Sequence, residues 1–319
     1  MIKSILRQLV FSLIALVFLT LIVFVLSNMV KGNTIDVFRA ENPDMSQETY
    51  EALVHELGYD KPVIVRYLNW LGDALHGDFG TSTATNRPVT EILAQRIGPT
   101  LLLSGMAMLV CILIGIPLGV MSAYKPYSIW DNISSFIAFC SSALPGFMLC
   151  LFAVFIFAVN LRWFPTSGMY TANGSHTFGD LLMHLVLPMF VLGMRMVGNI
   201  IKQTRSAVLE VMNEDYIKTA RSKGLGEFAV LVKHALRNAM IPVITTIALS
   251  VPYMVGGSVV IEQIFSWPGM GSMIISSINS RDYEPVLGAT LVICMTVLVV
   301  NFVLEFVYLI IDPRLRKGR

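Results

Sequence analysis

Two ionisable side chains stand inside long apolar stretches of this sequence, and they are the first candidates for chemistry. Arg195 lies seven residues before Lys202, and Glu305 lies seven residues before Asp312. At 1.5 Å per helical residue, both would sit about 10 Å from the polar end of their stretch. A charged side chain at that depth in a hydrocarbon layer is costly unless it is paired or faces water. We therefore predict an Arg195–Glu305 ion pair, with snorkelling of Arg195 to lipid headgroups as the alternative.

The sequence lacks the residue patterns typical of disulfide frameworks, metal sites and phosphate-binding loops. The cysteines all fall inside apolar stretches, which favours neither a disulfide framework nor a metal site: Cys111, Cys140, Cys150 and Cys294. The five histidines are scattered without metal-ligand spacing. Gly72 and Gly77 have phosphate-loop spacing, but Asp78 and Phe79 follow where Lys and Ser or Thr are required. We expect no catalytic residue, metal or cofactor in this chain, so that ATP and Mg²⁺, if used, are bound by another subunit.

The composition indicates an all-α integral membrane protein. Hydrophobic residues make up 55% of the 319 residues and charged residues only 14%. Each helical crossing of a bilayer needs about 20 apolar residues, and a transmembrane barrel would instead show alternating polarity. Six stretches qualify as transmembrane helices: 9–30, 99–123, 134–159, 181–201, 241–260 and 287–311. The first is too long for a signal peptide and reads as an uncleaved anchor.

The distribution of charge predicts the orientation of these helices. Segments 1–8, 123–133, 202–240 and 312–319 together hold 14 Lys or Arg against six acidic residues, whereas the intervening segments are net negative. Positively charged loops stay in the cytoplasm. We therefore expect both termini to be cytoplasmic, in a cell (plasma or inner) membrane.

The domain organisation follows from this topology. Residues 1–30 would form a cytoplasmic tip and the first span, 31–98 an extracytoplasmic helical loop, 99–311 a five-helix core with a cytoplasmic loop at 202–240, and 312–319 a cytoplasmic tail. In the extracytoplasmic loop, Asp44 and Gln47 resemble a capping pair for a helix ending at Gly58, and Pro62 starts a second helix. A cap on the outer membrane face is favoured over a ligand-binding module.

Small residues and prolines mark places where helices could approach or bend. Gly115 and Gly119 lie one turn apart, where the backbone of another helix could pack closely. Pro117, Pro145 and Pro188 can each free backbone carbonyls and bend a span.

A basic stretch, "DYIKTARSKGLGEFAVLVKHALRNAMIPVI" (215–244), separates two apolar runs. Asp215 can cap a short helix, Gly224 and Gly226 break it, and apolar residues then recur at helical spacing from Phe228 to Ala239. Two helices joined by a glycine elbow are predicted. Such a segment could lie on anionic lipid, or it could protrude as a rigid knob towards a partner, with Ala220 small enough to let the partner approach.

The same stretch resembles the cytoplasmic EAA loop of ABC-transporter permeases, specifically the dipeptide, oligopeptide and nickel importer group. Other segments resemble the B-type subunit of that group in order along nearly the whole chain: "LGYDKPVIVRYLNWLGDALHGDFGTS" (57–82), "RIGPTLLLSGMAMLVCILIGIPLGVMSA" (96–123), "WFPTSG" (163–168), "VVIEQIFSWPGMG" (259–271), "RDYEPV" (281–286) and "DPRLR" (312–316).

The resemblance implies a type I ABC importer permease fold in which the EAA loop couples the membrane helices to an ATPase. The residues it places at the coupling interface are Asp215, Tyr216, Lys218, Thr219, Ala220, Gly224 and Gly226. Lys218 stands at the motif's Glu position, Thr219 at its middle Ala and Arg237 at its distal Pro. A salt bridge from that Glu cannot be carried over, although Asp215 or Glu214 could substitute.

The resemblance also implies the partners and the cargo. A second homologous permease, two cytoplasmic ABC ATPases, an extracytoplasmic solute-binding protein and membrane lipids are expected, and no nucleic acid. Peptides are the expected cargo, and nickel or a metal chelate is the alternative. A membrane enzyme or receptor is the non-transport alternative, for which only Arg195 and Glu305 offer titratable groups at one depth.

Overall fold

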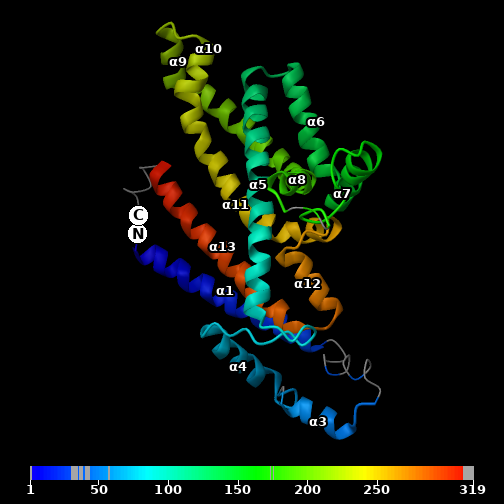
Figure 1. Ribbon diagram of the computed structural model, residues 1–319. Coiled ribbons are helices and arrows are strands. Elements are labelled where there is room, and N and C mark those ends of the chain that lie inside the picture. The colour runs from blue at the N-terminus through cyan, green and yellow to red at the C-terminus, as the bar shows by residue number, and fades with distance from the viewer. Residues whose placement is uncertain are drawn as a thin grey trace. The chain divides into compact units, whose positions relative to one another are not determined.

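The computed structural model describes residues 2–29, 35, 39, 44–56, 58–172, 174 and 176–311. Apart from one isolated bridge between Thr81 and Pro88, the described residues form helices and loops without β-structure. The helices are α1 (Ile2–Met29), α3 (Gln47–Glu56), α4 (Val63–Leu75), α5 (Val89–Tyr124), α6 (Ile129–Ala143), α7 (Gly146–Ala153), α8 (Phe178–Met212), α9 (Asp215–Ser222), α10 (Glu227–Val230), α11 (Leu236–Ile264), α12 (Met270–Asn279) and α13 (Tyr283–Ile311), with π-helical turns η1 (Val154–Asn160) and η2 (Leu231–Ala235) (Figure 1).

The helices confirm the predicted all-α membrane fold, with one correction. Among the described residues, five helical stretches are long and apolar enough to cross a membrane, and they correspond to the first, second, fourth, fifth and sixth predicted spans. The predicted span at 134–159 is wrong as a single helix, because α6 and the α7–η1 helix meet at a bend of 110°. Pro145, the residue preceding α7, lies at this break, as its predicted bending role requires. Pro188 instead remains inside the continuous helix α8.

Two compact units divide the chain differently from the topological segments. One unit comprises Met1–Pro99 with Pro268–Val299, and the other comprises Thr100–Trp267 with Val300–Arg319. The loop predicted at 31–98 therefore belongs to the same unit as α1, α12 and the first part of α13. The segment 312–319, predicted as a cytoplasmic tail, lies outside the described residues.

In the first unit, α4 packs on α1 and α13 through one buried tyrosine. Tyr67 is 3% exposed and contacts Phe24 and Leu287 in a small apolar cluster. Its hydroxyl lies 2.9 Å from Thr20 Oγ1 and donates to the Val17 carbonyl at 2.9 Å. The hydroxyl therefore satisfies its own hydrogen bonds while its ring fills the interface between the helices.

The start of α3 differs from the sequence prediction. Ser46, not Asp44, caps this helix, since Ser46 Oγ accepts a hydrogen bond from the Thr49 amide at 3.1 Å. Serine immediately before the first helical residue is the ordinary capping position, whereas Asp44 lies too far upstream. The predicted stop at Gly58 is confirmed by its φ of +67°.

In the second unit, α8 is the central helix, and glycines set how closely its neighbours approach. A Cβ added to Gly115 would lie 2.8 Å from Ile200, and one added to Gly119 would lie 2.6 Å from Thr204. The predicted close approach of another helix at these glycines is therefore confirmed, and the structure identifies that helix as α8. On α8 itself, a Cβ at Gly198 would lie 2.9 Å from the Ala138 carbonyl of α6. Small residues at both contacts allow the dense packing that stabilises helices in lipid.

A buried carboxylate joins α5, α6 and α8. Asp131 is 6% exposed and accepts from Arg205 Nε at 2.9 Å and from Arg205 Nη2 at 3.0 Å. The Tyr127 amide donates to the same carboxylate at 2.9 Å, and the Ser122 hydroxyl donates as well. Bidentate arginine pairing fixes orientation as well as distance, so this cluster sets the position of α6 against the other two helices.

We expect Asp131→Leu to lower the stability of the protein by about 2 kcal/mol or more, because it leaves the half-buried Arg205 guanidinium without its partner. The thermal unfolding temperature of the detergent-solubilised protein is the measurement. The double variant Asp131→Leu/Arg205→Met should regain part of the loss, since neither charge then remains unpaired. Equal unfolding temperatures for Asp131→Leu and the wild type would contradict this role.

Candidate functional site

The predicted glycine elbow is present between α9 and α10. Gly224 has a φ of +81° and open space around its α-carbon, so glycine is required there by conformation and not by packing. Gly226, the second predicted helix breaker, does not use this freedom. It precedes α10 with a φ of −65°, which any residue can adopt. One glycine, not two, therefore sets the reversal of the chain.

An ion pair closes the elbow. Arg221 Nε donates to Glu227 Oε1 at 2.8 Å, and Arg221 Nη2 donates to Glu227 Oε2 at 3.2 Å. Both side chains are substantially exposed, at 39% and 53%, so the pair contributes at most about 1 kcal/mol. Its effect is geometric, because a bidentate contact across Gly224 restricts the angle between α9 and α10. The sequence analysis missed this pair, although opposite charges flanking the glycines were its signal.

One face of the elbow packs onto its own unit. Ile217 and Ala220 are buried, together with Val230, Leu231 and Ala235 from the following turns. The prediction that Ala220 admits a partner surface is therefore corrected: with 6% exposure, its methyl group contacts the core of this chain. Its small size allows α9 to lie close to the helices beneath it.

The opposite face presents a mixed polar and apolar surface. Asp215, Lys218 and Thr219 are exposed, and Lys218 Nζ donates to Asp215 Oδ1 at 2.8 Å. Tyr216 is 42% exposed, and its hydroxyl accepts from Asn238 Nδ2 at 2.8 Å. Asp215 therefore pairs within α9, and its partner Lys218 is the residue that stands at the motif's Glu position.

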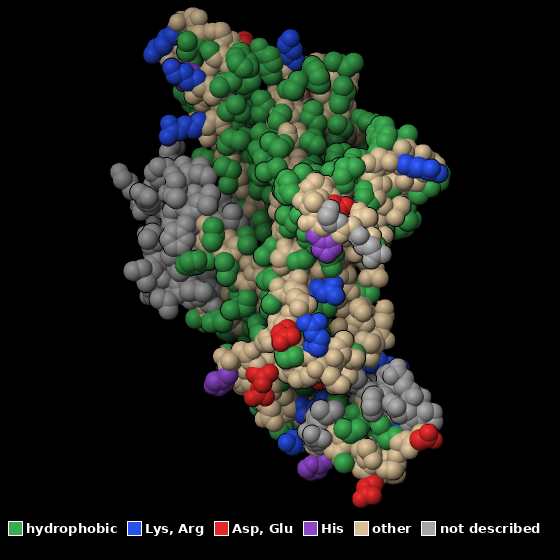
Figure 2. All heavy atoms as spheres, in the orientation of Figure 1, with side chains coloured by type: hydrophobic (Ala, Val, Ile, Leu, Met, Phe, Trp, Pro, Cys, Tyr) green, Lys and Arg blue, Asp and Glu red, His purple; other side chains and the backbone are tan. Residues whose placement is uncertain are grey.

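Apolar side chains are exposed at the same end. Leu225 is 38% exposed and Phe228 is 68% exposed, and Val232 is 49% exposed one turn later. Phe228 and Val232 were expected to share a face with Leu231 and Ala235, but the structure buries only the latter two. Figure 2 shows Lys and Arg side chains projecting around this tip, above helices whose visible surface is mostly hydrophobic. At this tip, charged side chains lie close in sequence to an exposed aromatic ring.

The part of the segment 259–271 that precedes Pro268 contributes buried side chains to the second unit. Glu262 is fully buried, and its Oε1 accepts from Thr100 at 2.8 Å and from Ser258 at 3.0 Å. Phe265 and Trp267 are also buried, and the Gly168 amide donates to the Phe265 carbonyl at 2.7 Å. These contacts hold the segment 163–168 against the end of α11. Both segments therefore have a structural role in this chain.

Only one of the two predicted intramembrane charges has a described side chain. Arg195 lies on α8 at the bend between α6 and α7, where a Cβ added to Gly146 would fall 2.8 Å from its Nε. Ser141 donates to the Arg195 carbonyl at 3.2 Å. Glu305 lies on α13, and its side chain is outside the described part of the chain. The Arg195–Glu305 pair thus stays a prediction.

The part of the chain that the structure describes offers no metal centre. Within it, no three His, Cys, Asp or Glu side chains converge as metal ligands, and the four cysteines are free. His184 is buried against backbone carbonyls of residues 167 and 168 and faces Asp180 at 3.5 Å. These contacts fix the loop before α8.

Comparison with known proteins places the chain in a family. Residues 115–317 match the family described as binding-protein-dependent transport system inner membrane component. The oligopeptide transport system permease protein AppB of Bacillus subtilis is 40% identical over 98% of both chains. The dipeptide transport system permease protein DppB of Escherichia coli is 34% identical over the full length of both.

The fold is shared with a solved transporter. A chain of the inward-facing MetNI methionine ABC transporter superposes with a TM-score of 0.52 at 16% identity, covering 69% of this chain and 96% of that one. This likeness confirms the predicted permease fold of type I importers. The chain belongs to the family of binding-protein-dependent transport system inner-membrane components.

Proposed function

We propose that this protein is a membrane-spanning, non-catalytic subunit of an ATP-driven importer of short peptides. The observation that carries the proposal is the full-length likeness to permeases named for oligopeptides and dipeptides, at 40% and 34% identity. Separate ATPase subunits, a second permease and an extracytoplasmic binding protein complete the importer.

The elbow of α9 and α10 is the surface that we assign to ATPase contact. It combines a buried apolar face that anchors it to the unit with an exposed tip that carries Phe228, Leu225 and basic side chains. An aromatic side chain surrounded by polar residues is typical of the centre of a protein interface. A lipid-coating segment would instead keep its apolar residues on one continuous face, whereas here they divide between opposite faces.

Deleting the gene for this chain should abolish uptake of a labelled dipeptide by intact cells while leaving uptake of ⁶³Ni²⁺ at the wild-type level. Restoring the gene on a plasmid should restore dipeptide uptake. Loss of nickel uptake with normal dipeptide uptake would overturn the peptide assignment in favour of a metal importer.

Reporter fusions test the proposed topology, in which the basic loop 202–240 is cytoplasmic. Alkaline phosphatase fused after Gly80 should be active, since it would be exported, and the same enzyme fused after Gly226 should be inactive. Green fluorescent protein at the two positions should give the opposite pattern. Active phosphatase after Gly226 is incompatible with contact between the elbow and a cytoplasmic ATPase.

The two glycines of the elbow provide a matched pair of substitutions. Gly224→Val should abolish peptide-stimulated ATP hydrolysis by the assembled importer, because a β-branched residue at a φ of +81° is strained by roughly 1 kcal/mol or more and the elbow must open. Gly226→Val should retain activity, since its φ of −65° is ordinary and no neighbour lies within 4 Å of its Cβ position. Co-purification of the ATPase subunits with each variant gives a second readout. Full coupled activity in Gly224→Val would show that the elbow geometry is not needed for coupling.

A further inference from the structure

A cavity lined by charged and apolar side chains lies within the first unit. It has a volume of about 450 Å³ and is lined by residues from α1, the loop before α4, α4 itself, the loop at 78–83 and the start of α13. Cavities that hold small molecules fall between about 300 and 1,000 Å³. The cavity is therefore large enough for a ligand of a few amino-acid residues.

Two polar atoms in the lining residues have unmet hydrogen-bonding capacity. Glu284 Oε2 and Trp70 Nε1 are both buried and lack a hydrogen-bond partner within the described structure. Buried polar atoms are nearly always paired, so each such exception requires an explanation. A ligand that supplies a cationic donor to Glu284 and an acceptor to Trp70 would satisfy both.

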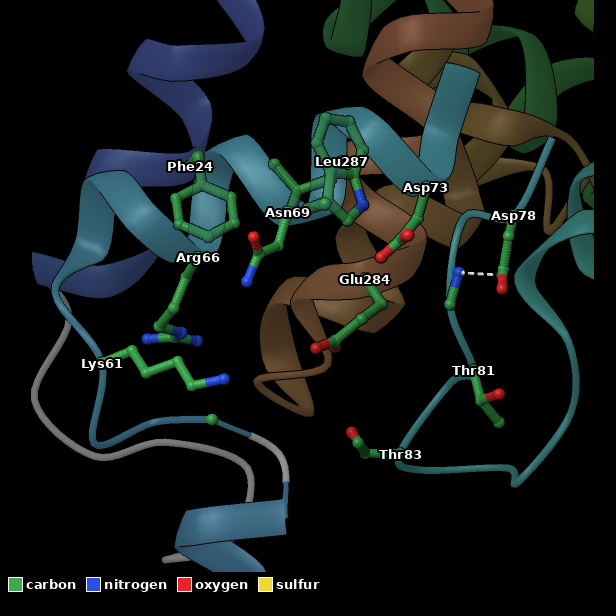
Figure 3. A pocket seen from close by; sticks show the side chains of 13 residues that line it. Phe24, Lys61, Arg66, Asn69, Asp73, Asp78, Thr81, Thr83, Glu284 and Leu287 are labelled. Atoms are coloured by element: carbon green, nitrogen blue, oxygen red, sulfur yellow. Dashed lines mark hydrogen bonds between the residues drawn. The ribbon is translucent and has the colours of Figure 1, made fainter. Parts of the chain in front are cut away.

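The charges around the cavity are separated by sign. In Figure 3 the Lys61 and Arg66 side chains extend from one side, Asp73 and Asp78 lie on the other, and the Glu284 carboxylate projects between them. A simple anion would face three carboxylates, and a simple cation would face Lys61 and Arg66. A zwitterion can satisfy both sides at once.

The arginine is held in place before any ligand arrives. Arg66 Nη1 donates to Asn28 Oδ1 at 2.6 Å, and its guanidinium lies 4.2 Å from the Tyr59 ring centroid and 5.8 Å from that of Phe24. Among the described residues this is its one side-chain hydrogen bond, so several of its five donors remain available there. A preorganised guanidinium beside a flexible lysine is suited to a carboxylate.

We propose that this cavity is a binding site for a zwitterionic short peptide. The peptide carboxylate would lie at Lys61 and Arg66, and its ammonium group would lie at Glu284 and Asp73. Two residues in extended conformation span about 7 Å between such groups, which matches a cavity of this size. The inference rests on the proposed function, because it assigns to the permease itself a second contact with the importer's cargo.

Binding of labelled Ala-Ala to the full-length permease in lipid nanodiscs, without a binding protein, is the test. Glu284→Gln should weaken binding at least about tenfold, since a charge-assisted hydrogen bond is lost while the shape is kept. N-acetyl-Ala-Ala should bind the wild type about as weakly as Ala-Ala binds Glu284→Gln. In Glu284→Gln itself, acetylation of the peptide should reduce its affinity little further.

The carboxylate end of the peptide allows an independent test that combines a protein variant with a modified peptide. Lys61→Gln should weaken Ala-Ala binding several-fold, and amidation of the peptide carboxylate should matter less in this variant than in the wild type. Lys61 is exposed, so this substitution leaves folding intact. Asp60→Asn removes a neighbouring surface carboxylate that does not line the cavity, and it should bind like the wild type.

Several results would overturn the inference. The first is no binding of Ala-Ala to the wild type, and the second is unchanged binding in both Glu284→Gln and Lys61→Gln. The third is equal affinity of the wild type for free Ala-Ala and for its acetylated or amidated forms, which is the behaviour expected of a site for an internal protein segment. Uptake by the complete importer is measured in parallel. Normal dipeptide uptake without binding to the permease would reject this site and leave the proposed function standing, whereas binding without any dipeptide uptake would support the site and reject the function.

Discussion

Close contact between the backbone of α8 and its neighbours is the constraint on which the second unit depends. Lipid tails are as apolar as leucine, so burial of apolar side chains drives helix association weakly inside a bilayer. Packing density and buried polar contacts must supply the stability instead. Dense packing comes from three glycines at which an added Cβ would meet atoms within 3 Å, namely Gly115 and Gly119 of α5 and Gly198 of α8. A buried polar contact comes from the Asp131–Arg205 pair, which also fixes the position of α6.

The elbow extends this logic to a surface. The helix that carries the glycine contacts and Arg205 ends at Met212, three residues before α9 begins. The buried face of α9 and η2 attaches the elbow to the same core, through Ile217, Ala220 and Leu231. A displacement at the exposed tip would therefore act on α8 and α11 through packed side chains. This arrangement would suit the coupling role that we propose for the elbow.

The first unit follows a different design, with polar groups at its centre. Asp282 is 2% exposed and accepts from Ser82 Oγ at 2.6 Å and from Thr83 Oγ1 at 3.0 Å, which ties the loop after α4 to the turn before α13. Its neighbour Glu284 has one oxygen that is buried without such a partner. The two carboxylates thus have different surroundings: Asp282 joins two loops through hydrogen bonds, and Glu284 lines a cavity.

The sequence alone determined the class of protein, the positions of five spans, the family and the elbow at Gly224. These follow from local or cumulative signals: hydropathy over about 20 residues, loop charge, glycine conformation and ordered motifs. Tertiary structure decided the bend in the third span, the inward direction of Ala220, the Asp131–Arg205 contact, the Arg221–Glu227 clamp and the cavity at Glu284. Hydropathy averages over a helix without recording which side faces a neighbour. Hydrogen-bonded partners that lie 74 residues apart, as Asp131 and Arg205 do, or 200 apart, as Ser82 and Asp282 do, leave no mark on one another's local sequence. Their pairing exists only once the helices have packed.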